Sequence, residues 1–275
     1  MKQVVQNLSN GETSLIEVPK PDNVPGCLLI ATVNSVVSSG TERTLVNFGK
    51  GNYLQKARQQ PEKVKEVINK IKTDGLVNTF DAVNSKLQEP LPLGYCNSGI
   101  VIDSQSDSFK KGDRVISNGH HAEIVRVPKN LCCKIPDKVD DETAAFTVLG
   151  AIALQGVRLA NPLIGETTVV FGLGLVGLLT VQILKANGCK VIGVDFDKDR
   201  CNLAKSFDIE TICPNEQEPI QQINNLTRNN GVDAVIITAS TESNELVHQA
   251  AEISRKRGRI ILVGVVCGGL STATV

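Results

Sequence analysis

The chain has 275 residues, of which 41% are hydrophobic and 21% charged, and its formal net charge is zero. This composition predicts a globular protein of one large or two ordinary domains, and it favours neither a nucleic-acid partner nor an anionic membrane surface. No apolar run is long enough to span a bilayer and the first residues do not open a signal peptide, so we expect a cytoplasmic protein.

The N-terminal half is predicted to be rich in β-strands. Short apolar runs at 28–37, 99–102, 114–116 and 123–127 are separated by Gly, Pro, Asn and Asp. A helical insert, residues 55–88, interrupts them, because Val64, Val67, Ile68 and Ile71 recur at helical spacing. The insert is interpreted either as an amphipathic helix that covers the core or as a lid or oligomer contact.

From about residue 140 the pattern changes to alternating helices and strands. Helices are expected at 142–159, after Gly174, and at 198–207, 219–227 and 243–254. Strands are expected at 169–171, 190–194, 210–213, 233–238 and 259–263. This α/β alternation predicts a doubly wound parallel sheet. The tail 267–275 has no helix or strand pattern, so we expect the sheet to lack its last strand. The predicted domains are 1–139, β-rich, and 140–275, α/β.

The most specific motif is a glycine turn between the first strand of this second domain and the helix that follows. Gly172, Gly174 and Gly177 fit G-x-G-x-x-G, and Asp195 ends the next strand. In a dinucleotide site the glycines allow a tight turn, close approach of a pyrophosphate and helix–strand packing, while the acid accepts from the ribose. The alternative is a packing joint that binds no ligand.

Asp195 also bears on the choice of cofactor. A carboxylate at this place accepts from the 2′-hydroxyl of NAD and repels the 2′-phosphate of NADP, although Lys198 and Arg200 lie close enough in sequence to soften that repulsion. NAD is therefore the predicted cofactor. The residues expected to bind it are Gly172, Gly174, Leu175, Val176, Gly177, Asp195, Arg200, Thr238 and Val263.

Five motifs in order along the chain carry a family resemblance. They are Ser-Gly-Thr-Glu at 39–42, Leu-Gly-Tyr-Cys at 93–96, Gly-Asp-Arg-Val at 112–115, Ala-Ala-Phe-Thr-Val at 144–148 and Val-Asp-Phe-Asp-Lys-Asp-Arg at 194–200. The chain thereby resembles the medium-chain dehydrogenase/reductase superfamily, the relatives of zinc-type alcohol dehydrogenase. The resemblance implies a GroES-like N-terminal domain for substrate and catalysis and a Rossmann domain for NAD.

Some segments resemble more closely a subgroup in which this module is fused to a sugar-type (Gfo/Idh/MocA-like) oxidoreductase module in surface-polysaccharide gene sets. Against that pattern the present chain is expected to be truncated at its C-terminus.

The metal ligands of the zinc enzymes are replaced in this sequence. At the three positions of the catalytic zinc stand Ser39, Tyr95 and Val148, and zinc requires thiolate, imidazole or carboxylate ligands. The cysteine-rich lobe of the structural zinc is also missing, because only the cysteine-free residues 116–121 follow the Gly-Asp-Arg-Val strand. No metal is therefore expected, and the resemblance narrows to the zinc-independent branch.

The candidate catalytic residues are Tyr95, Thr41 and His120. Thr41 matches the hydroxyl that relays protons in the family, and Tyr95 stands where a ligand faces the substrate. A phenol can donate to a carbonyl oxygen, and a histidine such as His120 or its neighbour His121 suits acid–base chemistry near neutral pH. The alternatives are structural hydroxyls in turns and a histidine in a surface loop.

Two interpretations of function follow from these motifs. The first is a zinc-independent, NAD(H)-dependent oxidoreductase that transfers hydride to or from a small carbonyl, alcohol or activated alkene. The second is an NAD-binding module of a larger two-module oxidoreductase, inactive by itself, in surface-polysaccharide biosynthesis. The expected partners are a small-molecule substrate and either a second copy of the chain or a fused or associated oxidoreductase module.

Overall fold

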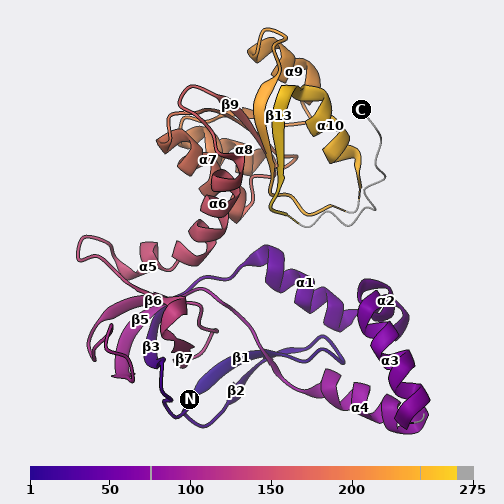
Figure 1. The fold of residues 1–275 in the computed structure, drawn as a ribbon, viewed down its shortest axis with the longest axis vertical. Helices are drawn as coiled ribbons and strands as arrows, with labels where there is room; N and C mark the ends of the chain where they lie inside the picture. The colour runs from indigo at the N-terminus through magenta and orange to yellow at the C-terminus, as the bar shows by residue number, and fades with distance from the viewer. Residues whose placement is uncertain (75, 242, 265–275) are drawn as a thin grey trace. The chain divides into compact units, whose positions relative to one another are not determined.

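A computed structural model describes residues 1–74, 76–241 and 243–264. The chain divides into two compact units, Met1–Val148 and Leu149–Val275, which we describe separately (Figure 1). The tail 267–275, and with it the expected absence of a last strand, lies outside the described residues. No helix in the described part of the chain is long and apolar enough to cross a membrane.

Unit 1 contains two β-sheets. The smaller sheet has the order β2-β1-β4 and the larger one the order β7-β3-β5-β6-β8, with antiparallel pairing throughout. Alternate apolar side chains of the larger sheet, such as Leu28, Ile30, Val101 and Val115, form a buried core. The strands are β1 (Lys2–Gln6), β2 (Thr13–Glu17), β3 (Cys27–Ser35), β4 (Leu91–Pro92), β5 (Asn97–Ser104), β6 (Arg114–Ser117), β7 (Ile124–Pro128) and β8 (Cys132–Lys134), with a short 3-10 helix η1 (Lys129–Leu131) before β8.

A run of helices joins β3 to β4 in unit 1: α1 (Ser39–Lys50), α2 (Tyr53–Gln59), α3 (Pro61–Asp74) and α4 (Leu76–Gln88). The helical segment therefore begins well before the predicted insert 55–88. The reason lies at the first turn of α1, where the Glu42 carboxylate accepts the backbone N–H of Ser38 at 2.8 Å. An acidic side chain that satisfies a free N–H at a helix start stabilises that start.

The helix expected at 142–159 is two helices, α5 (Asp141–Ala144) and α6 (Thr147–Ala160). The Thr147 hydroxyl donates to the Ala144 carbonyl at 2.7 Å. That carbonyl is the acceptor that an uninterrupted helix would offer to the N–H of residue 148, so the hydroxyl competes with the helix at this point.

Unit 2 confirms the predicted doubly wound parallel sheet. Its order is β11-β10-β9-β12-β13, and each described pair of neighbours is parallel. The bounds of β10 (Lys190–Val194) agree with the predicted strand. The other elements are β9 (Thr167–Phe171), α7 (Leu175–Ala186), α8 (Lys198–Ser206), β11 (Glu210–Ile212), α9 (Pro219–Leu226), β12 (Val232–Ile237), α10 (Glu245–Ile253) and β13 (Ser254–Leu262).

Helices cover both faces of this sheet, and its inner strands are apolar on both sides. On β9, Val170 packs in one core with residues of α6, α7 and α8, while Val169 and Phe171 pack in the other with residues of α9 and α10. Strands buried on both faces read as continuous apolar runs, which explains why the sequence identified them. The carboxyl ends of β9 and β12 lie side by side where the order of the strands reverses, from β9-β10-β11 on one side to β12-β13 on the other. This is the usual place of a ligand in such sheets.

Candidate functional site

The glycine turn at the carboxyl end of β9 has three glycines in three different environments. Gly172 has a φ of +92°, and a Cβ there would lie 2.7 Å from the backbone nitrogen of Ala239. A Cβ on Gly177 would lie 1.9 Å from the carbonyl oxygen of Gly172, so only glycine lets α7 pack this closely on the turn. Gly174, the N-cap of α7, faces open space, with nothing within 4 Å of an added Cβ.

That open space lies at the N-terminus of α7. Backbone N–H groups in the first turn of a helix have no acceptor within the helix, and the helix dipole adds positive character there. Leu175, Val176 and Gly177 supply these groups. The turn thus has the geometry in which a pyrophosphate binds, with room beside Gly174 for the phosphates.

Asp195 holds this turn from the end of β10. One carboxylate oxygen accepts the N–H of Leu173 at 2.6 Å and the other accepts the N–H of Asp197 at 2.8 Å. The side chain is 10% exposed, and Arg200 Nη1 lies 3.6 Å from Oδ2. A carboxylate offers about four acceptor positions, so acceptor capacity remains for ribose hydroxyls.

Lys198, which was expected to soften the charge of Asp195, is engaged with another partner. Its ammonium donates to Glu216 at 2.5 Å, and that hydrogen bond raises the pKa of Lys198. Arg200 also bonds Asp197, with its Nε 3.4 Å from Oδ2.

The two other expected cofactor residues follow strands β12 and β13. The Thr238 hydroxyl donates to the Gly172 carbonyl at 2.7 Å and therefore braces the glycine turn. The Val263 N–H donates to Ile237 at 2.9 Å, which continues the sheet ladder, and the Val263 side chain fills the space over Gly156 of α6. The expected cofactor residues therefore lie at the carboxyl ends of β9, β10, β12 and β13 or in the first turns of α7 and α8.

Two of the three candidate catalytic residues meet in a cluster of hydroxyls in unit 1. The Tyr95 hydroxyl donates to Ser38 Oγ at 2.7 Å, and Thr41 Oγ1 lies 3.4 Å from the Tyr95 oxygen. Thr41 is exposed, Tyr95 is half-buried and Ser38 is buried. We call Ser38, Thr41 and Tyr95 the hydroxyl cluster. A cluster of this kind can donate to a polarised oxygen of a ligand.

The sequence alone did not reveal the ionisable pair behind this cluster, His121 and Glu42. His121 Nε2 lies 3.1 Å from Glu42 Oε2, and each side chain is 9% exposed. Glu42 was visible in the Ser-Gly-Thr-Glu motif and His121 in a His-His pair, but no local pattern indicates their contact. The one local signal is the spacing of Glu42 after Ser38, which is typical of an acid near a helix N-terminus.

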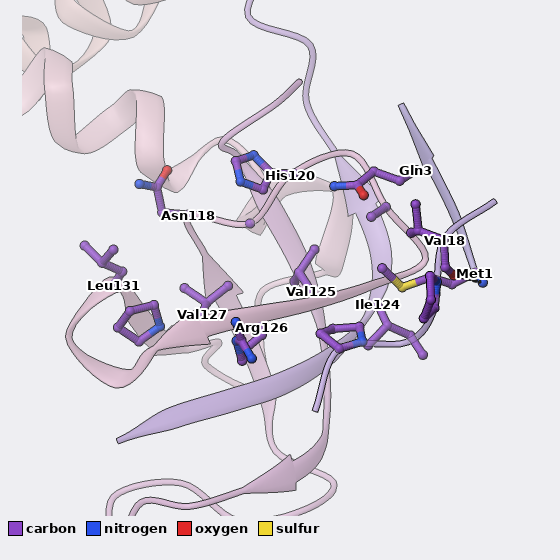
Figure 2. Close-up of a pocket in the computed structure, with 15 residues that line it drawn as sticks. Met1, Gln3, Val18, Asn118, His120, Ile124, Val125, Arg126, Val127 and Leu131 are labelled. Carbon is purple, nitrogen blue, oxygen red and sulfur yellow. Dashed lines mark hydrogen bonds between the residues drawn. The ribbon is translucent and has the colours of Figure 1, made fainter. Parts of the chain in front are cut away.

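His120, the third candidate, lies apart from the hydroxyl cluster. Its Nδ1 is 2.8 Å from the carbonyl oxygen of Gly94. The His120 side chain lines a hollow of about 460 Å³ in unit 1. Figure 2 shows that hollow, with Asn118 and His120 at one end and Met1 and Val18 at the other. Neither Tyr95 nor Thr41 is among the described residues that line it.

Within the described residues, no three His, Cys, Asp or Glu side chains come together so that they could hold a metal ion. Ser39, which stands at one zinc-ligand position, is an exposed hydroxyl in the first turn of α1. A serine hydroxyl is not among the thiolate, imidazole and carboxylate ligands that zinc takes in proteins.

Dehydrogenases and a reductase are among the known proteins that this chain resembles. Residues 176–274 match the family described as zinc-binding dehydrogenase. A probable D-xylulose reductase A of Neosartorya fischeri is 26% identical over an alignment of 216 residues, and the match covers 65% of this chain and 60% of that protein. The chain therefore matches less than two thirds of the length of this curated relative.

Solved structures share the fold over nearly the whole chain. Alcohol dehydrogenase TADH from Thermus sp. ATN1 has a TM-score of 0.77 and 20% identity, covering 100% of this chain and 81% of its own. A putative zinc-binding dehydrogenase from Sinorhizobium meliloti 1021, bound to NADP, has a TM-score of 0.73 and 21% identity, covering 97% of this chain and 78% of its own. At such identities the likeness shows the fold, and it confirms the predicted fold class.

Proposed function

We propose that this chain is a nicotinamide-dependent oxidoreductase that transfers hydride to or from a small carbonyl compound, alcohol or activated alkene. The premise is its place in the medium-chain dehydrogenase/reductase superfamily, which the match to the zinc-binding dehydrogenase family and the shared fold support. The matched relatives named as a xylulose reductase and an alcohol dehydrogenase favour a hydroxyl or carbonyl group as the reacting centre.

The glycine turn is the observation that carries the proposal. Gly174 faces open space at the start of α7, while Gly172 and Gly177 are each confined by backbone within 3 Å of an added Cβ. A turn that served only for packing would not need a glycine at the open position, since a side chain there would meet nothing. Space for a pyrophosphate explains the glycine at that position.

The residues of unit 2 fit a dinucleotide. When bound, the nicotinamide supplies or accepts the hydride. The first turn of α7 would hold the phosphates through its N–H groups, and Asp195 would accept from the ribose while it keeps the turn in place. Thr238 and Val263 would border the cofactor from the ends of β12 and β13.

NAD is the proposed cofactor in preference to NADP. Asp195 carries a negative charge at the expected ribose position, and Lys198 is engaged with Glu216. Arg200, at 3.6 Å, is the nearby cation that opposes this preference. A similar structure is bound to NADP, so the preference of this chain rests on Asp195 and requires its own measurement.

We propose further that the reaction does not depend on zinc. The positions of the zinc ligands hold Ser39, Tyr95 and Val148, and these side chains do not supply the donors that zinc requires. The hydroxyl cluster would take over the role of polarising the substrate oxygen. Tyr95 would be the donor, with its O–H turned from Ser38 Oγ to the substrate and the Ser38 hydroxyl donating to the phenol oxygen in its place. Thr41, exposed and 3.4 Å from the Tyr95 oxygen, would contact the same substrate group.

Fluorescence titration of NADH and NADPH tests the cofactor assignment. NADH is expected to bind more tightly, and Asp195→Ala is expected to narrow the gap, because removing the carboxylate removes the repulsion of a 2′-phosphate. Asp197→Asn is the matched control, an acid in the same turn that lies farther along the chain. Equal or tighter binding of NADPH by the parent protein would overturn the preference for NAD.

A further inference from the structure

The ionisable pair of unit 1 joins segments that are far apart in the sequence. Glu42 lies in α1 and His121 in the loop before β7. His121 Nε2 is 3.3 Å from Glu42 Oε1 and 3.1 Å from Oε2, and His121 Nδ1 is 2.9 Å from the hydroxyl of Ser35, at the end of β3. The imidazole ring therefore connects three segments through its two nitrogens.

A fourth segment is held against the face of the same ring. Gly94 has a φ of +89°, and a Cβ on it would lie 2.7 Å from ring atoms of His121. The backbone N–H of His121 donates to the Leu93 carbonyl at 2.8 Å. Tyr95 directly follows Gly94, so the position of Tyr95 depends on the position of the His121 ring.

Glu42 reaches the hydroxyl cluster by a second route. Its Oε1 accepts the backbone N–H of Ser38 at 2.8 Å, and Ser38 Oγ accepts the Tyr95 hydroxyl at 2.7 Å. Ser38 is the N-cap of α1, yet its side chain makes no capping bond. The Ser38 hydroxyl instead accepts a hydrogen bond from Tyr95, and the N–H of Ser38 donates to Glu42.

We infer that Glu42 and His121 are positioning residues that fix the Tyr95 hydroxyl through Ser38 and through the 93–95 segment. This inference rests on the proposed function, in which Tyr95 donates to the substrate oxygen. A buried pair of ionisable groups is weak evidence for stability, because desolvation offsets any attraction and apolar side chains can replace the pair. Apolar side chains cannot replace the hydrogen bond that the Ser38 N–H donates to Glu42, nor the two contacts of the His121 ring nitrogens with Glu42 and Ser35.

The chain offers a direct readout of Tyr95 that is independent of activity. It contains two tyrosines and no tryptophan, so in a Tyr53→Phe background the tyrosine fluorescence and the near-ultraviolet tyrosine dichroism come from Tyr95. Glu42→Leu, which removes the carboxylate acceptors, and His121→Gln would be compared in that background with Glu17→Leu and His248→Gln, which alter exposed residues. We expect the first two to lose most of the tyrosine dichroism and the second two to keep it.

Turnover is the second readout. With Tyr95 displaced, kcat is expected to fall roughly 100-fold, the effect of a misplacement of about 1 Å, while the Kd for the dinucleotide stays at the parent value. If Glu42→Leu prevents folding, Ser38→Ala tests the same link, because it removes the acceptor of the Tyr95 hydroxyl and leaves the contact between His121 and Glu42 intact. Ser38→Ala is then expected to reduce the dichroism and kcat together.

The outcomes separate the two proposals. Unchanged Tyr95 spectra in Glu42→Leu, His121→Gln and Ser38→Ala would overturn the positioning role, whatever the activity. If the Tyr95 spectra change in these variants but the parent protein shows no turnover, the positioning role is supported and the proposed function is contradicted.

Discussion

At the scale of single residues, Gly174 and Gly177 differ more than their motif implies. A Cβ on Gly174 would meet nothing within 4 Å, whereas a Cβ on Gly177 would overlap the Gly172 carbonyl. The φ of Gly174 is −68° and its ψ is −172°, values that ordinary residues adopt without strain. A substitution at Gly174 therefore tests dinucleotide binding, and a substitution at Gly177 tests folding.

Gly174→Val is expected to abolish dinucleotide binding and leave the melting temperature unchanged, because the side chain fills the pyrophosphate space only. Gly177→Val is expected to lower the melting temperature, since α7 must move off the turn. Fluorescence titration and thermal unfolding measure the two effects. A Gly174→Val protein that binds NADH as the parent does would show that the turn is structural.

The Tyr95 hydroxyl gives a second prediction at this scale. Tyr95→Phe is expected to reduce kcat roughly 100-fold, the usual effect of removing one donor to a developing negative oxygen, with little change in the Kd for the dinucleotide. Thr41→Val is expected to cost less, because Thr41 is exposed and lies 3.4 Å from the Tyr95 oxygen. If kcat is unchanged in Tyr95→Phe, the donor must be sought at His120 or His121.

At the scale of elements, α7 links the cofactor turn to the core of unit 2. Leu184 of α7 is 0% exposed and packs in the same core as Val170 and Ile236 of the sheet. Leu184→Ala is expected to destabilise the protein by about 2–5 kcal/mol through loss of burial and the cavity it leaves. Leu226→Ala, at a 49% exposed position in α9, is the control, with an expected effect of about 0.5 kcal/mol or less. Urea unfolding measures both, and equal effects would contradict the assigned packing.

The same elements show what the sequence predicts well. The inner strands of unit 2 are buried on both faces, so β9 and β12 contain the apolar runs 169–171 and 234–237, and β10 was predicted with the correct bounds. Strands β1 and β2 were not predicted, because they are short and carry polar side chains. Helix α1 was not predicted because its start depends on one side-chain contact, Glu42 to Ser38.

The candidate site also has one part that the sequence predicts and one part that it does not. The glycine turn and Asp195 follow from local spacing, because one strand–turn–helix–strand unit contains them all. The pair of Glu42 and His121 joins residues 79 positions apart, so only the folded sheet of unit 1 brings them together. The bond from Tyr95 to Ser38 likewise spans 57 positions. Contacts of this kind are set by tertiary structure, and no periodicity in the sequence encodes them.

At the scale of the whole molecule, each unit supplies one part of the proposed chemistry. Unit 2 contributes the glycine turn and Asp195, and unit 1 contributes the hydroxyl cluster with the pair behind it. The zinc-binding dehydrogenase family matches residues 176–274, which lie in unit 2. The residues that replace the metal ligands lie in unit 1. The claim that this chain works without zinc therefore depends on unit 1.

Turnover of NAD(H) by chelator-treated protein, on a panel of small polyols and the matching ketones, tests that claim most directly. We predict that the rate of nicotinamide oxidation or reduction is the same before and after removal of metal, is unaffected by added zinc, and is lost in Gly174→Val. Turnover that disappears with the chelator and returns with zinc would contradict the account, as would tight NADH binding with no turnover on any substrate of the panel.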